Sequence, residues 1–109
     1  MKIEDLLAPD EVVKLRGPMA YYAHDKGFLW VTNRAVYAYC TKAYGKGWHW
    51  EIVHYQDVAG IELHRDDNEN MCTIDFSGIG FSTLQIPNVT TAETVFCCIK
   101  REWSAAKKR

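Results

Sequence analysis

Short strand-like runs separated by turn clusters make up the chain between residues 11 and 86. The runs are rich in Val, Ile, Tyr, Trp, Phe and Thr, residue types that favour β-strands. The clusters between them read RGP, HDKG, TNR, YGKG, RDDNEN and SGIG. The alternation of strand-like runs and turn clusters predicts about seven strands, over residues 11–86, in one antiparallel meander.

The run after residue 88 differs, because its apolar residues recur at helical spacing. They are Ala92, Val95, Phe96, Ile99 and Trp103. Thr90 and Glu93 have the spacing of a capping box. We therefore expect an amphipathic helix over about residues 91–105, whose apolar stripe caps an open end of the β structure. A shorter helical turn is expected over residues 3–8, ended by Pro9 and packed as a lid.

The size of the chain limits how many cores it can build. A chain of 109 residues with 48% hydrophobic and 13% aromatic content fills one core and hardly two. We expect residues 1–109 to form a single domain, mainly β with one C-terminal α-helix.

Three stretches, in this order, resemble the bacterial pleckstrin-homology-like domain family: LLAPDEVVKLRG, KGFLWVTNRAVYAY and YQDVAGIEL. The family pattern is an LL-x-P-x-E opening, a GxLxVTxxRxxxY hairpin and a Y-x-D-I-x-x-I-E strand entry. The resemblance covers roughly residues 5–103. It implies a seven-stranded antiparallel barrel or sandwich capped by the helix. It also implies assembly into symmetric homo-oligomers, some of them ring-like.

The stretch GFLWVTNRAVYAY is apolar on both sides of a predicted hairpin. The expected partners are Phe28 with Tyr39, Leu29 with Ala38, Trp30 with Tyr37 and Val31 with Val36. A second hairpin around AYGK is expected to pair Tyr39 with Ile52, Thr41 with Trp50 and Tyr37 with His54. Alternation then assigns Leu29, Val31, Val36, Ala38, Cys40 and Val53 to one face. The other face gathers Phe28, Trp30, Tyr37, Tyr39, Trp48, Trp50 and Ile52.

An outward-facing aromatic face would expose several hundred square ångströms, which monomers seldom tolerate. If the aliphatic face lines the interior, the expected protein-interface residues are Phe28, Trp30, Tyr37, Tyr39, Trp48 and Trp50. In the alternative interpretation, the aromatic residues form the core, and His49 and Glu51 mark a solvated aliphatic side. A three-residue loop with a bulge would also exchange the two faces.

Charge and cysteine content exclude several classes of protein. Lys and Arg number 13 against 14 Asp and Glu, so the formal net charge is −1, which disfavours a general nucleic-acid binder. The acidic N-terminus is unlike a secretory signal, and no segment approaches about 18 apolar residues. Cys40, Cys72, Cys97 and Cys98 lack the spacing of a disulfide framework. We expect reduced thiols in a cytoplasmic protein.

Neither a metal site nor a catalytic site is expected. His49 and His54 fall on opposite faces of a strand, while His24 and His64 lie on other segments. The acids in RDDNEN lack the spacing of a calcium loop. No nucleophile, base and orienting acid can be assembled from the sequence, so we predict no enzyme activity and no cofactor.

Lys14, Arg16 and Lys26 fall in the region where eukaryotic pleckstrin-homology domains bind inositol phosphates. They are the candidate residues for an alternative function, the peripheral binding of anionic lipid headgroups or another acidic ligand. Contact of the basic C-terminal residues with a membrane would be weak and salt-sensitive. The leading hypothesis is a non-catalytic interaction module whose partners are copies of itself and a further, unknown protein.

Overall fold

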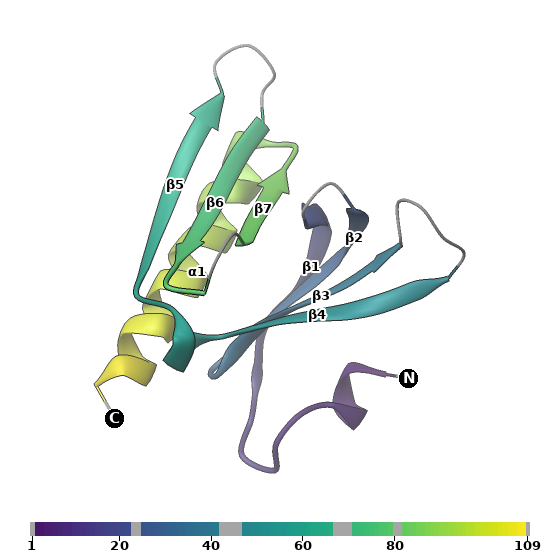
Figure 1. The fold of residues 1–109 in the computed structure, drawn as a ribbon, viewed down its shortest axis with the longest axis vertical. Coiled ribbons are helices and arrows are strands. Elements are labelled where there is room, and N and C mark those ends of the chain that lie inside the picture. Colours follow the sequence, from purple (N-terminus) through teal and green to yellow (C-terminus); the bar gives the residue numbers. More distant parts are fainter. Residues whose placement is uncertain (1, 23–24, 42–46, 67–70, 80–81, 109) are drawn as a thin grey trace.

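The structure, a computed structural model, describes residues 2–22, 25–41, 47–66, 71–79 and 82–108. Three helical elements are a 3-10 turn η1 (Ile3–Asp5), a second 3-10 turn η2 (Tyr55–Asp57) and the helix α1 (Val89–Lys107). The described residues also form seven strands: β1 (Val13–Tyr22), β2 (Asp25–Thr32), β3 (Ala35–Thr41), β4 (Trp48–His54), β5 (Gly60–Asp66), β6 (Met71–Ser77) and β7 (Ser82–Ile86). The chain is mainly β with one C-terminal helix, as the sequence predicted (Figure 1).

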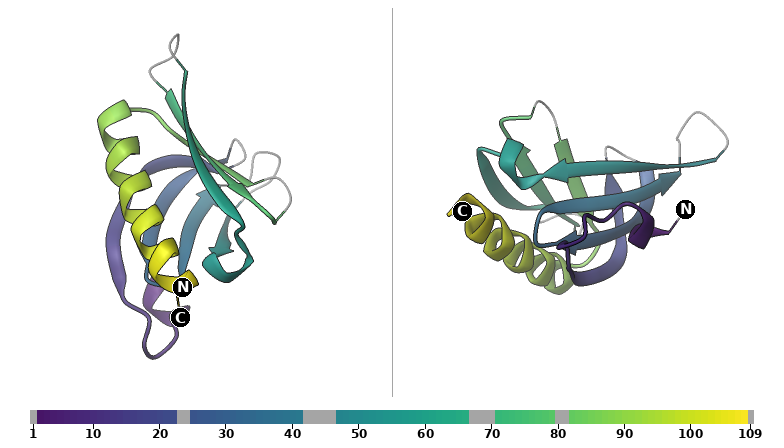
Figure 2. Two further views of the ribbon diagram at one scale, coloured as in Figure 1. Left: turned by 90° about the vertical axis from the view of Figure 1, so that its left-hand side faces the viewer. Right: turned by 90° about the horizontal axis from the view of Figure 1, so that it is seen from below.

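One antiparallel sheet contains all the strands, in the order β4-β3-β2-β1-β7-β6-β5. The sheet is not closed into a barrel, because β4 and β5 form its two edges. It bends sharply between β1 and β7, which pair through Tyr21 and Tyr22. Strands β1–β4 and β5–β7 therefore form two layers, and α1 lies against the opening between them (Figures 1 and 2). This open sandwich is compatible with a pleckstrin-homology shape.

The core lies between the two layers and α1. The strands contribute Leu29, Val31, Val36, Val53, Ile74, Phe76, Leu84 and Ile86, all of them buried. The helix adds the buried residues Ala92, Val95 and Ile99, with Phe96 and Trp103 packed at the margin. The Trp103 indole N–H donates to the carbonyl oxygen of Val58 at 3.0 Å. The apolar stripe of the helix thus covers the core, as its spacing predicted.

The start of α1 differs from the prediction. Asn88 is the N-cap, and its Oδ1 accepts a hydrogen bond from the backbone N–H of Thr91 at 3.0 Å. The predicted capping box at Thr90 and Glu93 is therefore wrong, and both residues lie inside the helix. The reason is that Asn is one of the best capping residues, and it comes first along the chain after β7.

The register of the first hairpin is confirmed in all four pairs, from Phe28 with Tyr39 to Val31 with Val36. The second hairpin is displaced by two residues, so that Tyr39 pairs with Trp50 rather than with Ile52. Likewise, Thr41 pairs with Trp48, and Tyr37 pairs with Ile52. A two-residue displacement leaves every side chain on its face, so the hydrophobic pattern cannot detect it. The residues of the connecting loop, 42–46, lie outside the described part of the chain.

The aliphatic face is the core face, and the aromatic face points away from the core, as in the first of the two interpretations. Every aliphatic-face residue from Leu29 to Val53 is at most 3% exposed, so this face lines the core. The alternative, in which the aromatic residues form the core and the hairpin faces are exchanged, is wrong. The physical reason is that β6, β7 and α1 supply Ile, Leu and Val side chains that fill the interior against the aliphatic face.

Candidate functional site

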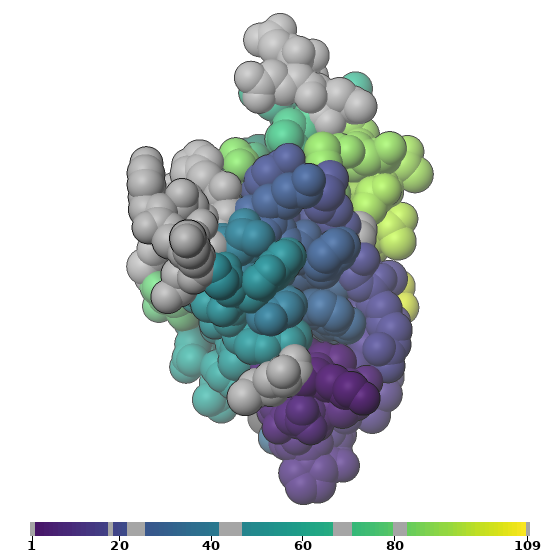
Figure 3. Space-filling view, turned by 90° about the vertical axis from the view of Figure 1, so that its right-hand side faces the viewer, coloured from purple at the N-terminus to yellow at the C-terminus, as the bar shows by residue number. Residues whose placement is uncertain are grey.

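The candidate site is the outer face of the β2-β3-β4 layer, which we call the aromatic face. It consists of Phe28 and Trp30 from β2, Tyr37 and Tyr39 from β3, and Trp48, Trp50 and Ile52 from β4. Alternation along each strand places these side chains outward, opposite the core. Figure 3 views the molecule from this side, with the strands in blue to teal.

The rings on this face form a connected array. Tyr39 lies between two tryptophans, with its ring centroid 5.0 Å from that of Trp48 and 4.7 Å from that of Trp50. The centroids of Trp30 and Trp50 are 5.3 Å apart, and Tyr37 meets Trp50 edge-on at 6.4 Å. Such pairs add about 0.5–1.5 kcal/mol each beyond the area that they bury. The rings therefore hold one another in position, and the array is a preformed surface.

One half of the aromatic face is covered by the N-terminus of the same chain. Leu6, Leu7 and the buried Ile3 pack in one apolar cluster with Tyr37, Trp30 and Trp50, together with Ala35. In Figure 3 the purple N-terminal segment lies over the lower part of the strands. The predicted helical turn near residues 3–8 is thus η1 with the residues that follow it, and it does cover a surface. That surface is the aromatic face, not the core.

The covering segment is anchored by Glu11. Its Oε2 accepts hydrogen bonds from the hydroxyl groups of Thr32 at 2.6 Å and Tyr37 at 2.7 Å. Its Oε1 accepts one from the backbone N–H of Ala8 at 3.1 Å. Burial, and then the hydrogen bond to Glu11, raises the pKa of Tyr37 well above its ordinary value. Tyr37 is only 3% exposed, so of the six predicted interface residues it is the one that a partner could not reach here.

Further polar contacts hold the same segment. Asp10 forms an ion pair with Arg34, and the backbone N–H of Val12 donates to Oδ1 of Asn33 at 2.7 Å. Both Arg34 and Asn33 lie in the turn between β2 and β3. The segment therefore contacts the turn end of the hairpin through polar groups and the hairpin face through apolar ones.

The other half of the aromatic face is open to solvent. Phe28 and Trp48 are each 48% exposed, and Met19 beside them is 38% exposed. Ile52, which pairs with the covered Tyr37, is also 38% exposed at the edge of the sheet. Met19, Phe28 and Trp48 line an apolar groove of about 260 Å³, with Gly27, Thr41 and Lys26 completing its wall. Met19 was missed from the sequence, because a β-bulge between Arg16 and Met19 breaks the alternation along β1.

Strand β4, which carries Trp48 and Ile52, is also an edge of the sheet. Among the described strands it pairs with β3 on one side and with no strand on the other. On its core-facing side, the imidazole Nε2 of His49 lies 3.2 Å from a carboxylate oxygen of Glu51. These two side chains, 21% and 41% exposed, are polar groups on the inner face at the rim of the core. An edge strand with an apolar outer face can pair with a strand of another chain, which extends the sheet.

The three basic residues proposed for an acidic ligand do not all come together. Arg16 lies 3.7 Å from Glu4 of η1 and lines a pocket beside α1. Lys14 lies near Cys98 of the same helix. Lys26 instead lines the groove with Phe28 and Trp48. The fold therefore places Lys26 apart from the other two.

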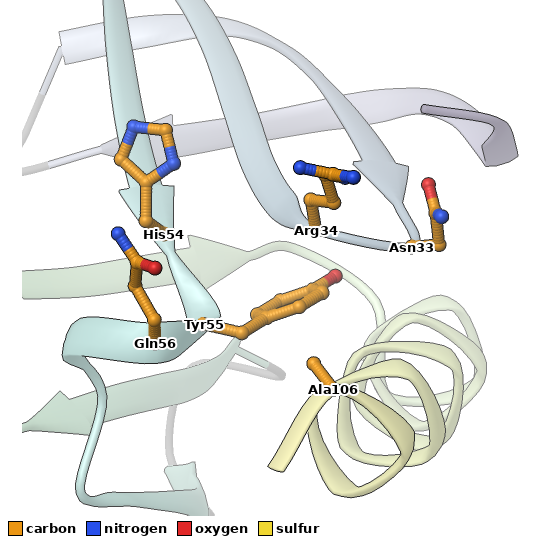
Figure 4. A pocket seen from close by; sticks show the side chains of 6 residues that line it. All are labelled: Asn33, Arg34, His54, Tyr55, Gln56 and Ala106. Carbon is orange, nitrogen blue, oxygen red and sulfur yellow. The ribbon is translucent and has the colours of Figure 1, made fainter. Parts of the chain in front are cut away.

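A pocket lies where the β2-β3 turn, η2 and the end of α1 meet. It has a volume of about 440 Å³, and Asn33, Arg34, His54, Tyr55, Gln56 and Ala106 line it (Figure 4). The Tyr55 ring forms the floor, and its hydroxyl donates to the backbone carbonyl of Thr32 at 2.8 Å. Burial raises the pKa of Tyr55 above its ordinary value. Tyr55 therefore serves as a structural residue, and Arg34 is occupied by Asp10.

The remaining histidines and acids have surface roles in the described part of the chain. Nε2 of His64 lies 3.1 Å from Glu62 and 3.1 Å from Asp75, across exposed positions of β5 and β6. Within the described ranges, no group of three or more His, Cys, Asp or Glu side chains is arranged to hold a metal ion. His24 and most of RDDNEN lie outside those ranges.

None of the described helices combines the length and the apolar character that crossing a bilayer requires. The four cysteines, all in described positions, are not joined by disulfides. In comparisons with known proteins, the chain matches no family model and no curated protein. The resemblance to the bacterial pleckstrin-homology-like family therefore rests on the three sequence stretches and on a compatible fold.

Proposed function

We propose that this chain is a cytoplasmic, non-catalytic module of the bacterial pleckstrin-homology type that acts by binding protein, first of all copies of itself. The observation that carries the proposal is the open half of the aromatic face on an edge strand. Phe28, Trp48 and Ile52 are large apolar side chains that remain exposed although the N-terminal segment packs against their neighbours on the same strands. A patch that combines aromatic anchors with an unpaired strand edge is typical of protein interfaces.

The free energy gained by burying the exposed apolar patch supports association. Burying half of a patch of about 400 Å² contributes about 5 kcal/mol before the entropic cost of association is subtracted. This is enough for micromolar binding only when backbone pairing or further contacts add to it. Strand β4 offers such pairing along the same surface.

The covered half shows what kind of group the aromatic face accepts. Ile3, Leu6 and Leu7 are aliphatic side chains presented by a short helical turn, and they pack on Trp30 and Trp50. The open half has the same chemistry and lies on the same strands. A partner that presents aliphatic or aromatic side chains is therefore the natural occupant of the open half.

Size-exclusion chromatography with light scattering tests this proposal. We expect a mass of at least twice 12.5 kDa at about 100 µM protein, falling towards 12.5 kDa on dilution. Trp48→Ala should shift the midpoint of this transition to at least tenfold higher concentration. Val12→Ala is the matched control, because Val12 is 53% exposed but lies outside the aromatic face. A monomeric wild-type protein at 100 µM would contradict the proposal.

Binding to vesicles decides between this function and the alternative of anionic-lipid binding. Co-sedimentation with phosphatidylserine vesicles that is lost in Lys26→Ala would favour the alternative, because Lys26 lies beside the exposed Phe28 and Trp48. For a protein-binding module we expect no vesicle binding at physiological salt, while self-association persists.

A further inference from the structure

Two strands of the same sheet have unpaired edges, and they differ in how the edge is protected. Strand β5 has exposed charged side chains at Glu62, Arg65 and Asp66. Charges on an edge strand are a common defence against pairing with another chain. Strand β4 instead places Trp48, Trp50 and Ile52 on its outer face. Of the two edges, β4 is thus the one suited to pair with a second chain.

A second copy of β4 can meet the first in an antiparallel arrangement about a two-fold axis. Both copies must then keep their aromatic sides on the same surface, because their aliphatic sides enter the two cores. Directly opposite residues must therefore belong to the same face. The two-fold axis must therefore lie between one residue of β4 and the same residue of the second copy. The three central residues at which it can lie are His49, Trp50 and Glu51.

The side chains distinguish these three registers. An axis at Glu51 would place the two Glu51 carboxylates opposite each other, and an axis at His49 would do the same with the two imidazoles. An axis at Trp50 places His49 opposite Glu51 of the second copy, twice by symmetry. It also places Trp48 opposite Ile52 and the two Trp50 rings side by side. Imidazole–carboxylate contacts and apolar pairs then coincide in one register, whereas two carboxylates directly opposite each other destabilise a sheet.

We propose that two copies of this chain pair through β4 in an antiparallel register centred on Trp50, with His49 of each copy opposite Glu51 of the other. His49 and Glu51 already lie 3.2 Å apart within one copy. The pairing extends this contact into a ring of four alternating groups. The proposal rests on the self-association proposed above, and it adds the edge, the symmetry and the register.

Disulfide trapping tests the register. Copies carrying His49→Cys are mixed with copies carrying Glu51→Cys. Both are made in a Cys40→Ala, Cys97→Ser background, which removes the thiol directly opposite position 49 in the same copy and the exposed thiol of α1. Directly opposite residues in antiparallel strands have Cα atoms about 4.5–5.5 Å apart, which a disulfide spans. We expect a cross-linked dimer in the mixture and none in either variant alone.

Each other outcome overturns the proposed register. Cross-linking of Glu51→Cys alone would move the axis to Glu51, and cross-linking of His49→Cys alone would move it to His49. If light scattering shows assembly while no combination cross-links, pairing through β4 is wrong although self-association stands. If the wild-type protein is monomeric at about 100 µM, both proposals fail together.

A charge exchange provides an independent measurement. Glu51→Lys replaces the carboxylate opposite each His49 with an ammonium, which cannot accept a hydrogen bond from the imidazole, so we expect association to weaken about tenfold over the two symmetric pairs. Combining it with His49→Glu places opposite charges across each pair and should recover most of the affinity. Glu62→Lys on β5 is the matched control and should leave association unchanged. A double variant as weak as the single one would overturn the proposed pairing of His49 with Glu51.

Discussion

The two halves of the aromatic face have the same residue types on the same three strands, yet they have different roles. In the covered half, Trp30, Tyr37 and Trp50 pack beneath the N-terminal segment. In the open half, Phe28 and Trp48 remain 48% exposed. The difference shows that an aromatic residue on an outer sheet face can serve stability or binding, depending on whether the chain itself returns to cover it.

The largest expected effect on stability comes from the covered half. Trp50→Ala removes a ring that contacts Trp30, Tyr37, Tyr39 and the N-terminal segment. We expect a loss of about 3 kcal/mol in the free energy of unfolding, measured by urea denaturation. A loss below about 1 kcal/mol would mean that the covered half is no more structural than the open one.

The anchor of the covering segment comes next. Glu11→Ala removes the carboxylate that accepts from Thr32, Tyr37 and Ala8. Because these donors are part-buried, we expect a loss of about 2 kcal/mol in unfolding free energy, with a smaller loss for Glu11→Gln, which keeps one acceptor. Glu4→Ala on the same segment removes an exposed ion pair with Arg16 and should cost under about 0.5 kcal/mol. Equal losses in the Glu11 and Glu4 variants would show that Glu11 is no anchor.

Alkaline pH should weaken the covered half. The pKa of Tyr37 in the folded protein is raised above the ordinary value of 10.0, while in the unfolded chain it returns to that value. Above pH 10 the unfolded state releases this proton and the folded state keeps it, so stability falls as the pH rises, by at most about 1.4 kcal/mol per pH unit. Urea denaturation between pH 9 and pH 11 should show a smaller slope for Tyr37→Phe. The pKa of Tyr55 is also raised, and Tyr55 contributes to the pH dependence of both the wild-type and the Tyr37→Phe protein.

The smallest effect on stability is expected in the open half. Trp48→Ala loses the ring contact with Tyr39, and we expect a cost of no more than about 1 kcal/mol in unfolding free energy. The same variant should nevertheless weaken self-association strongly. A Trp48→Ala protein that is as destabilised as Trp50→Ala would remove the distinction between the two halves.

Much of the local architecture could be read from neighbouring residues. The turn clusters and the alternation gave the number of strands, the pairs from Phe28–Tyr39 to Val31–Val36 and the membership of each face. The helical spacing from Ala92 to Trp103 gave the helix and its buried stripe. Three details failed for physical reasons. A displacement of two residues between β3 and β4 preserves the hydrophobic pattern, and the bulge before Met19 interrupts it. Asn88, which precedes Thr90 along the chain, caps the helix instead of the predicted capping box.

The amino-acid sequence alone determined that one layer of this protein has an aliphatic side and an aromatic side, because alternation is a property of consecutive residues. It left open which side is the core. Only the tertiary structure decided that, since β6, β7 and α1 bring aliphatic side chains against one side, and the N-terminal segment reaches half of the other. Burial depends on what distant segments present, and local periodicity carries no information about them.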